Sequence, residues 1–286
     1  MTAQPTTALL ISTYNWPAAL QLCLSSVRQQ TALPDEVVIA DDGSDPTTRM
    51  VIEQAIAEIP TPILHIWHPD NGFRLAEIRN KAIAAASSDY LISIDGDLVL
   101  HPEFIRDHLR FRPKGAWVQG TRVPLLADKT DAFFDHGIQW SHWYELGAQK
   151  PLKILRSTLW HRLTTKKRPK YDKPTGCHQA FWRHDLLEVN GFDQRFQGWG
   201  AEDADLSIRL YNAGIPRVDF RSIAIAMHLY HPPSSKDRSD DNHAMSREAL
   251  ETRRSRAAHG VDRWLDQPIE WHYEHQQATR ASESTP

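Results

Sequence analysis

The sequence predicts an α/β protein with a Rossmann-like, mostly parallel sheet flanked by helices. Short apolar segments alternate with longer segments of helical periodicity over the first part of the chain, which is typical of this class. The 286 residues are 41% hydrophobic and 24% charged, so the chain can bury a large core without disulfides. The formal net charge of −3 disfavours a disordered chain and a basic nucleic-acid binder, so no nucleic-acid partner is expected.

Four strands are predicted from short runs of aliphatic and β-branched residues, with three helices between them. The expected strands are residues 8–13, 36–40, 63–67 and 90–94. The expected helices are residues 18–30, 47–58 and 75–87. Parallel strands joined by helices bind ligands beyond the carboxyl ends of the strands. Polar residues follow three of these strands, so we expect a binding site at that edge of the sheet.

The alternation is looser after residue 100, where a basic, Trp-rich segment interrupts it. We expect a strand at 117–123, a strand passing into a helix at 180–189, a helix at 202–212, a β-rich segment at 218–230 and a helix at 244–259. One domain is predicted over residues 1–233, with an inserted basic helical segment at about 125–175. Residues 234–286 are predicted to form a polar, partly helical tail.

Cys23 and Cys177 are the two cysteines, and neither belongs to a C-x-x-C pair. We expect both to be reduced packing residues. The chain does not open with a cationic segment and a long apolar run, and no stretch approaches the roughly 20 apolar residues that span a bilayer. A cytoplasmic location, extending to the inner face of the membrane, is therefore expected.

Asp95 and Asp97 follow the fourth expected strand and are separated only by Gly96. Carboxylates this close repel each other unless a proton or a cation lies between them. Their expected ligand is a divalent cation that also binds phosphate oxygens. The alternative is a surface turn with solvated acids.

His228 and His231 follow the β-rich segment and add nitrogen ligands to this set. Imidazole together with carboxylate and phosphate oxygens suits Mn²⁺ better than Mg²⁺, which prefers oxygen ligands. The alternative is a pair of ordinary histidines, one of them at a strand end.

Residues 199–205, WGAEDAD, place three acids at the start of a helix. The dipole and the free N–H groups of a helix start favour ionised carboxylates. A carboxylate that is ionised and faces a cleft is suited to act as a general base, and Trp199 is suited to stack on a sugar ring. The alternative is helix capping, because acids are favoured at a helix start for stability alone.

Arg74 and Arg79 lie at the start of the third expected helix, in the segment NGFRLAEIRN. Guanidinium groups donate paired hydrogen bonds to diphosphates, so these residues are candidates for holding one. The alternative is a solvated helix face.

In chain order, these segments resemble family-two glycosyltransferases of the GT-A fold. The resemblance rests on Thr-Tyr-Asn after the first strand, the Asp-Asp-Gly-Ser turn, the Arg-Asn pair in the third helix, the D-x-D and the late Gly-Trp-Gly-Ala-Glu-Asp. This last segment and the His-x-x-His are similar to the galactosyltransferase-like C-terminal half of bacterial chondroitin polymerases and animal β-1,4-galactosyltransferases. The resemblance covers roughly residues 6–124 and 174–233.

The resemblance implies a role for each matching residue. It implies a donor site for a nucleotide sugar, expected to carry UDP, formed by Thr13, Tyr14, Asp41, Asp42, Phe73, Arg74, Arg79 and Asp95. It implies a metal site at Asp97 and His231, with Asp95 and His228 as further ligands. Asp203 is implied as the catalytic base, and Glu202 as a second catalytic-site residue that binds acceptor hydroxyls. Trp199, from the stacking argument above, is expected to bind the acceptor as well. Ala201 departs from the pattern, because the galactosyltransferases have a glycine there, and this leaves the loop conformation and the donor sugar open.

The activity implied by the resemblance is a metal-dependent, inverting sugar transfer to a hydroxyl of a glycan or lipid-linked saccharide, as in the synthesis of bacterial surface polysaccharide or lipopolysaccharide. One alternative is a nucleotidyltransferase, which should have a Gly-rich, basic loop after the first strand. This chain has Tyr-Asn-Trp-Pro at that place. The other alternative is a non-catalytic carbohydrate-binding protein, which would explain the ten tryptophans but not the combined acidic and histidine sets.

Residues 150–173 hold nine Lys and Arg and one acid, so this segment carries +8 and the rest of the chain −11. The spacing of Leu152, Leu155, Leu159 and Leu163 predicts a helix over 151–163 with one leucine face. Such a helix can pack its leucines on the catalytic core, or it can lie on an anionic membrane surface. The sequence leaves both alternatives open.

Overall fold

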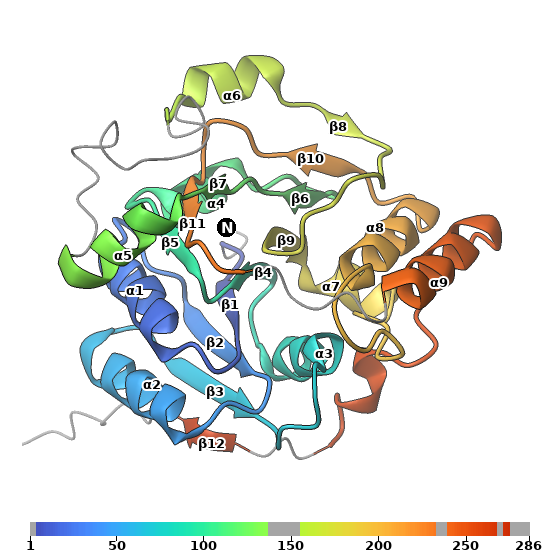
Figure 1. Cartoon of the computed structure of the whole chain (residues 1–286). Helices are drawn as coiled ribbons and strands as arrows, with labels where there is room; N and C mark the ends of the chain where they lie inside the picture. The colour runs from blue at the N-terminus through green and yellow to red at the C-terminus, as the bar shows by residue number, and fades with distance from the viewer. Residues whose placement is uncertain (1–3, 137–154, 233–238, 268–270, 275–286) are drawn as a thin grey trace, which may run out of the picture.

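The centre of the described part of the protein is a sheet of nine strands with helices on both faces (Figure 1). The structure is a computed structural model that describes residues 4–136, 155–232, 239–267 and 271–274. In this part of the chain the strand order is β12-β3-β2-β1-β4-β9-β6-β10-β8. The strands are β1 (Thr7–Thr13), β2 (Glu36–Asp41), β3 (Ile63–Trp67), β4 (Tyr90–Asp95), β6 (Trp117–Gln119), β8 (Lys167–Arg168), β9 (His178–Trp182), β10 (Arg217–Asp219) and β12 (Trp271–Glu274).

Helices cover the two faces of the sheet in separate groups. One group, α1 (Pro17–Arg28), α2 (Pro46–Glu58) and α4 (Phe104–Phe111), packs on one face. The other face is covered by α3 (Leu75–Ala85), α7 (Arg183–Glu188) and α8 (Glu202–Asn212). The sequence of β1 is continuously apolar because both faces of the strand are covered. Leu9 and Ile11 pack toward the first group of helices, and Ala8 and Leu10 toward the second. A strand buried on both faces has no polar side.

The sheet is mixed rather than purely parallel. Strand β1 pairs in parallel with β2 and β4, and β2 pairs in parallel with β3, which confirms the mostly parallel sheet predicted from the first hundred residues. Strand β9 runs antiparallel to both β4 and β6. The start of β9, rather than its end, therefore lies at the carboxyl edge of β4, where the Asp95 N–H donates to the Cys177 carbonyl at 3.1 Å.

Two segments predicted as single β-rich runs are each divided between two sheets. The segment 117–123 forms β6 and then β7 (Val123–Pro124), and the segment 218–230 forms β10 and then β11 (Ala226–His228). Strands β7 and β11 join β5 (Leu98–Leu100) in a second sheet of order β5-β11-β7. This small sheet carries His228 next to the D-x-D turn, because β5 follows that turn directly.

The C-terminal helix differs from its predicted bounds. Helix α9 (Ser239–Glu251) begins and ends earlier than the expected 244–259. Arg253 has a φ of 54°, a left-handed conformation that a helix cannot continue through. Helix α9 packs beside α8, and Asn212 Nδ2 donates to the Ala249 carbonyl at 2.9 Å. A short 3₁₀ turn, η3 (Val261–Arg263), follows.

The predicted leucine helix is shorter in the structure. In the described part of the chain it is α6 (Thr158–Thr164), so Leu155 precedes the helix, and residues 151–154 lie outside the described residues. Helix α5 (Ala127–His136) was not expected from the sequence. Both cysteines are buried and unbridged, as predicted. Across the described ranges, no helix has both the length and the apolar character to cross a bilayer.

Candidate active site

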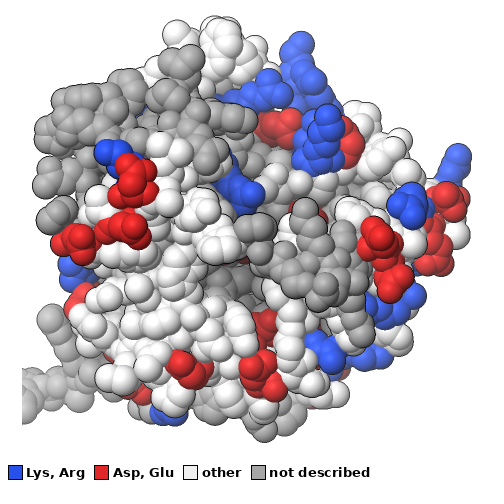
Figure 2. All heavy atoms as spheres, viewed as in Figure 1, with Lys and Arg blue, Asp and Glu red and all other residues white. Residues whose placement is uncertain are grey.

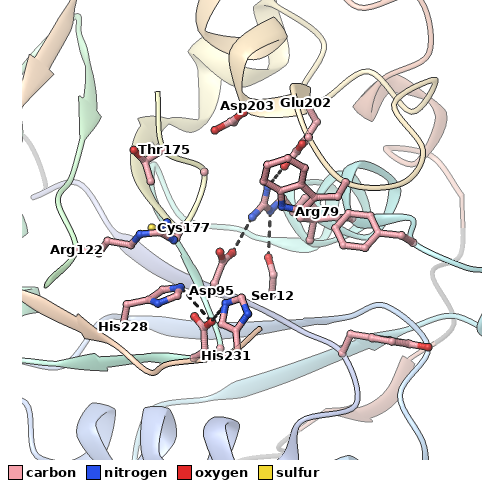
Figure 3. Close-up of a pocket in the computed structure, with 18 of the residues that line it drawn as sticks. Ser12, Arg79, Asp95, Arg122, Thr175, Cys177, Glu202, Asp203, His228 and His231 are labelled. Atoms are coloured by element: carbon pink, nitrogen blue, oxygen red, sulfur yellow. Dashed lines mark hydrogen bonds and ion pairs between the residues drawn. The ribbon is translucent and has the colours of Figure 1, made fainter. Parts of the chain in front are cut away.

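The carboxyl ends of β1, β2 and β4 open into a cleft of about 910 Å³. The start of α8, the end of β11 and the segment before β9 form its other walls (Figure 3). Most of the predicted site residues line this cleft: Thr13, Tyr14, Asp42, Phe73, Arg79, Asp95, Asp97, Trp199, Glu202, Asp203, His228 and His231. Residues predicted from distant parts of the sequence are thus brought together in one place.

Asp42 is the acid of the Asp-Asp-Gly-Ser turn that faces the cleft. Its Oδ1 lies 2.7 Å from His68 Nε2, and its Oδ2 accepts the backbone N–H of Arg74 at 2.8 Å. Burial opposes a charge on His68, but its hydrogen bonds to Asp42 and Glu77 outweigh burial and raise its pKa. These contacts hold the Asp42 carboxylate in one orientation at the end of β2.

Asp41 and Arg74 do not line the cleft. Asp41 is buried, where Oδ1 accepts the Ser44 N–H at 2.8 Å and Oδ2 lies 3.0 Å from His65 Nε2. Arg74 donates through Nε to the Asn71 carbonyl at 3.1 Å, so its side chain bonds to its own turn. The structure therefore gives these two residues supporting positions, and Arg74 acts on Asp42 through its backbone.

Gly96 lets the chain turn between the two acids of the D-x-D. Its N–H donates to the Ser12 carbonyl at 2.7 Å, and a Cβ at this position would lie 3.0 Å from the same oxygen. A larger residue would push the turn away from β1. The close approach points Asp95 toward Arg79 (Figure 3). Asp97 Oδ2 lies near the two histidines instead.

Asp97, His228 and His231 form a candidate metal site. One ligand atom from each lies within 4.8 Å of the others, and Asp97 Oδ2 is 3.3 Å from the Nε2 atom of each histidine. The second oxygen, Oδ1, is buried and has no hydrogen-bond partner among the described residues. A buried, unsatisfied carboxylate oxygen is costly, and a cation would satisfy it. One carboxylate and two imidazoles fit a divalent transition ion.

The two histidines differ in their affinity for protons. Burial lowers the pKa of His228 to about 4, so its ring is neutral at pH 7 and can donate a lone pair. The hydrogen bond to Asp97 raises the pKa of His231, whose Nδ1 donates to the Pro232 carbonyl at 2.7 Å. A proton on Nε2 of His231 therefore takes the place that a cation would occupy.

Arg79 connects the two walls of the cleft. It is almost fully buried, and it donates through Nη2 to Asp95 at 2.8 Å and through Nε to the Ser12 hydroxyl at 3.1 Å. Its Nη1 reaches Glu202 at 3.4 Å. Burial raises the pKa of Asp95, and the Arg79 charge opposes that rise. Arg79 thus fixes one carboxylate of β4 relative to one carboxylate of α8.

The loop before α8 places Trp199 at the rim of the cleft. Gly198, Gly200 and Ala201 have φ values of 74°, 105° and 67°. Glycine adopts such values freely, but alanine in the left-handed region costs roughly 1–2 kcal/mol. Ala201, where the related galactosyltransferases were expected to have glycine, thus holds a strained conformation at the start of α8. The Gly198 N–H donates to the Phe73 carbonyl at 3.2 Å, which ties this loop to the donor side.

Glu202 and Asp203 open α8 in different environments. Glu202 is buried beside Arg79, and burial together with the neighbouring Asp203 charge raises its pKa to about 7. Asp203 is half-buried, and its Oδ1 accepts the Ala204 N–H at 2.8 Å. Gly176 lies against it, since a Cβ there would be 3.3 Å from Asp203 Cβ. Asp203 is the more accessible carboxylate, as a base that must reach a bound hydroxyl needs to be.

Sequence reasoning missed Arg122, Thr175 and Cys177, which also line the cleft. Arg122 follows β6 and reaches toward Cys177 and His228 (Figure 3). Burial raises the pKa of Asp95 and the Arg122 charge opposes that rise, so Arg122 acts within the site. The signal in the sequence was a charged residue just after a short strand, but the expectation of one continuous strand over 117–123 concealed it.

A buried histidine pair supports the segment that carries Arg122. His178 Nδ1 lies 3.2 Å from the Thr121 carbonyl, and His178 Nε2 lies 2.9 Å from His108 Nε2. Burial lowers the pKa of both, to about 4 for His178, so both rings are neutral at pH 7. Because the His178 Nδ1–H donates to Thr121, its Nε2 accepts from His108. This arrangement fixes both tautomers and holds the backbone beside Arg122.

A family model described as glycosyl transferase family 2 matches residues 8–173, more than half of the chain. The chain belongs to this family. A second model, described as the N-terminal domain of galactosyltransferase, matches residues 161–232 of this family 2 glycosyltransferase. The two matches confirm the resemblance predicted from the motif order. They also favour sugar transfer over the nucleotidyltransferase and carbohydrate-binding alternatives.

Curated relatives of this family 2 glycosyltransferase are longer proteins. It is 28% identical over 255 residues to validoxylamine A glucosyltransferase of Streptomyces hygroscopicus subsp. limoneus, covering 74% of this chain and 49% of the relative. It is 26% identical to chondroitin synthase of Escherichia coli, covering 83% of this chain and 36% of the relative. It is 24% identical to hyaluronan synthase of Pasteurella multocida, covering 92% of this chain and 28% of the relative. The chain thus spans about half or less of the length of these relatives.

Solved structures with the same fold include residues 1–349 of S. aureus TarS. The TM-score is 0.59 at 14% identity, covering 91% of this chain and 69% of that one. The same TarS fragment in complex with UDP matches equally well. At this level of identity the likeness concerns the fold, and it confirms the α/β class predicted for this family 2 glycosyltransferase.

Proposed function

We propose that the protein transfers a sugar from a UDP-linked donor to a hydroxyl of a glycan or lipid-linked saccharide, with inversion at the anomeric carbon. The observation that carries this proposal is one cleft that holds both the accessible carboxylate of Asp203 and the ligand set around Asp97. Transfer to a hydroxyl needs a base for the attacking oxygen and stabilisation of the departing diphosphate. UDP is favoured because the similar TarS fragment was solved in complex with UDP.

In this proposal the donor lies along the carboxyl ends of β1, β2 and β4. Asp42, held by His68, contacts the nucleoside, and Thr13 and Tyr14 line the same pocket. Phe73 adds an exposed ring at the rim. Arg122 supplies a positive charge to the cleft, whereas the Arg79 charge is already shared by Asp95 and Glu202. We therefore assign a direct role toward the diphosphate to Arg122 and a positioning role to Arg79.

Asp97, His228 and His231 would hold a divalent cation, and two nitrogen ligands favour Mn²⁺ over Mg²⁺. When bound, such a cation neutralises charge that develops on a leaving diphosphate. Asp95 is turned toward Arg79, and it lies close enough to this set for the Asp97 charge to raise its pKa.

The acceptor is bound at the start of α8. Trp199 presents an exposed ring for stacking on a sugar, and Glu202 offers a hydrogen bond to a hydroxyl. Asp203 takes the proton of the acceptor hydroxyl while that oxygen bonds to the anomeric carbon and the bond from that carbon to the diphosphate oxygen breaks. Attack from the face opposite the leaving group inverts the anomeric centre.

The relatives guide the proposed product class. Two of them are named as synthases of chondroitin and of hyaluronan, which are glycans. We therefore place the product among glycans such as bacterial surface polysaccharide or the saccharide part of lipopolysaccharide.

A panel of nucleotide sugars, with and without Mn²⁺, tests the proposed function. At least one UDP-sugar should be hydrolysed slowly and should stabilise the protein against heat, and both effects should need the metal. A ligand at about 100 times its Kd adds about 2.7 kcal/mol of stability, which a thermal shift resolves. The proposal would be wrong if, with Mn²⁺ present, the protein hydrolysed none of the nucleotide sugars and none of them stabilised it against heat.

A further inference from the structure

Helix α6 turns its large apolar side chains away from the protein. Leu159 and Leu163 are each 68% exposed, Trp160 is 57% exposed, and Leu155, just before the helix, is 43% exposed. The packing of this leucine face on the core, one of the two alternatives from the sequence, is therefore wrong for these residues. Exposed apolar side chains grouped in this way are typical of an interaction surface.

The exposure is not a sign of a detached helix, because α6 is anchored by its other side. His161 is buried and lies edge-on to Phe111 and Phe220, with ring centres 5.0 and 5.2 Å away. Just before the helix, Arg156 makes two hydrogen bonds to Asp107, at 2.6 and 2.9 Å. The helix thus packs through a histidine and an ion pair and presents its leucines outward.

Positive charge surrounds this apolar group. Residues 155–173 contain seven Lys and Arg and a single acid. Arg162, Lys166 and Arg168 are exposed, whereas Asp172 and Asp219 both lie within 4 Å of Lys170. Figure 2 shows the uncharged side chains of α6 at the top of the molecule, beside a group of Lys and Arg over the segment that leads to β8.

We propose that this surface, the α6 surface (Leu155, Leu159, Trp160 and Leu163 with Arg162, Lys166 and Arg168), docks on the headgroup region of an anionic lipid bilayer. Leucine and tryptophan side chains enter the boundary between headgroups and acyl chains, where amphipathic helices bind. The cations meet lipid phosphates, and each is worth roughly fivefold in binding. A second copy of the chain fits less well, because a two-fold contact would bring this basic surface against itself.

The α6 surface leads along the chain to the acceptor side of the cleft. Lys173 and Thr175, a few residues beyond β8, line the cleft, and the next residue, Gly176, lies against Asp203. A bilayer docked on α6 would therefore be connected, through residues 165–176, to the wall of the cleft that contains Asp203. The inference concerns a surface outside the cleft and does not depend on the sugar transfer proposed above.

Vesicle flotation of the full chain tests the inference. The protein is mixed with vesicles of phosphatidylcholine, alone or with phosphatidylglycerol, at low and high salt. It should float only with the anionic vesicles, and less at high salt. The double variant Leu159→Ser/Leu163→Ser should bind at least about tenfold more weakly, because two side chains lose their apolar contact. Lys166→Gln/Arg168→Gln should also lose about tenfold or more.

Matched controls separate this surface from general effects. Met50→Ser removes a side chain on α2 that is 67% exposed, and Arg247→Gln/Arg253→Gln removes two exposed cations near the end of α9. Both controls should float like the wild type, and near-ultraviolet circular dichroism should show that all variants are folded. Wild-type protein that stays unbound with anionic vesicles would overturn the inference. Flotation of the α6 variants at the wild-type level would also overturn the inference. A dimer that forms without lipid and that Leu159→Ser/Leu163→Ser converts to monomer would overturn it as well.

Discussion

At the scale of single residues, the candidate metal site contains one histidine that binds a proton readily and one that does not. The pKa of His228 is about 4, whereas hydrogen bonding to Asp97 raises the pKa of His231 above its ordinary value of 6.5. The carboxylate that would help to bind a cation therefore also stabilises a proton in its place. Binding of a cation must release that proton.

This coupling predicts the pH dependence of metal binding. As pH falls below the pKa of His231, the affinity for Mn²⁺ should fall by about tenfold per pH unit, because one proton is displaced. Calorimetric titration between pH 8 and pH 5.5 measures it. His231→Gln should weaken binding at pH 8 and flatten the dependence, and Asp97→Ala should remove binding. An affinity equal at both pH values in the wild type would contradict the assignment.

Glu202 is a buried acid whose charge destabilises the fold. Its pKa is about 7 in the folded protein against an ordinary 4.5, so the folded state holds an extra proton between these values. Stability linked to this group is therefore present below pH 4.5 and is lost as pH rises to 7. Glu202→Gln cannot ionise and should be more stable than the wild type at pH 8, by up to about 3 kcal/mol, and equal to it at pH 4.5.

Urea unfolding at both pH values measures this difference. Glu251→Gln, at an exposed position, is the control and should change stability little at either pH. A Glu202→Gln variant that gains nothing at pH 8 would show that the buried carboxylate carries no such penalty.

At the scale of elements, the loop from Gly198 to Ala201 determines how α8 presents its acids. Three left-handed residues in four positions turn the chain sharply, and the last of them is an alanine at φ 67°. Ala201→Val should destabilise the protein by about 1–2 kcal/mol, because a β-branched side chain is least tolerated in this conformation. Ala201→Gly should not destabilise it.

Ala213 provides the matched position for this prediction. It follows the other end of α8 with an ordinary φ of −76°, so Ala213→Val should cost less than Ala201→Val. Denaturant unfolding compares the variants. Equal losses at the two positions would mean that conformational strain at Ala201 is not important.

The elements that the sequence predicted well are those with one environment along their whole length. Strand β1 is buried on both faces, so its apolar run has a single interpretation, and the same holds for β2 and β4. The segment 117–123 crosses from one sheet to the other at Gly120, where a Cβ would lie 2.0 Å from His178 Nδ1. His178 belongs to a strand that is distant in the sequence, so the local hydrophobic pattern could not predict this contact.

The sequence predicted those site residues whose side chains lie at the end of a strand or at the start of a helix. Asp97 and His231 follow strand ends, Asp203 lies in the first turn of α8, and all three line the cleft together. Asp41 and Asp42 are adjacent, and only packing against His65 and His68 decides which of them faces the cleft. Pairing between distant segments likewise determines the positions of Arg79 and Arg122, so their partners could not be read from the sequence.

At the scale of the whole molecule, the C-terminal part of the described chain braces the acceptor side of the cleft. Arg254, just beyond α9, donates to Asp193 and to Asp205, both at 3.1 Å, and both carboxylates are fully buried. Asp205 lies on α8, two residues after the proposed base. The segment after α9 is thus linked electrostatically to the helix that carries the proposed base.

Removal of this link should affect stability strongly. Arg254→Ala leaves two buried carboxylates each with one partner fewer, so we expect a loss of about 2 kcal/mol or more. The control is Arg28→Ala, whose ion pair with Glu58 is half exposed and should contribute under about 1 kcal/mol. Thermal or denaturant unfolding compares the two. Similar small losses would mean that the contact does not brace the fold.

The net charge of −3 describes an average of two unlike regions. The cleft gathers Asp42, Asp95, Asp97, Glu202 and Asp203, which need a cation before they can accept a diphosphate. The segment 150–173, which leads to the cleft, holds nine Lys and Arg against one acid, and Arg162, Lys166 and Arg168 are exposed. The two proposals thus assign the diphosphate donor and the anionic lipid surface to separate regions of the described chain.

The most direct test of the proposed mechanism compares donor binding and turnover in Asp203→Asn. This variant keeps the size of the side chain but removes the base, so turnover should fall by about 10²–10⁴-fold. The calorimetric affinity for UDP with Mn²⁺ should stay unchanged, because the proposal assigns Asp203 to the acceptor and not to UDP. A variant that turns over at the wild-type rate would show that Asp203 is not the base. Loss of UDP binding in parallel with activity would contradict the separation of donor and acceptor roles.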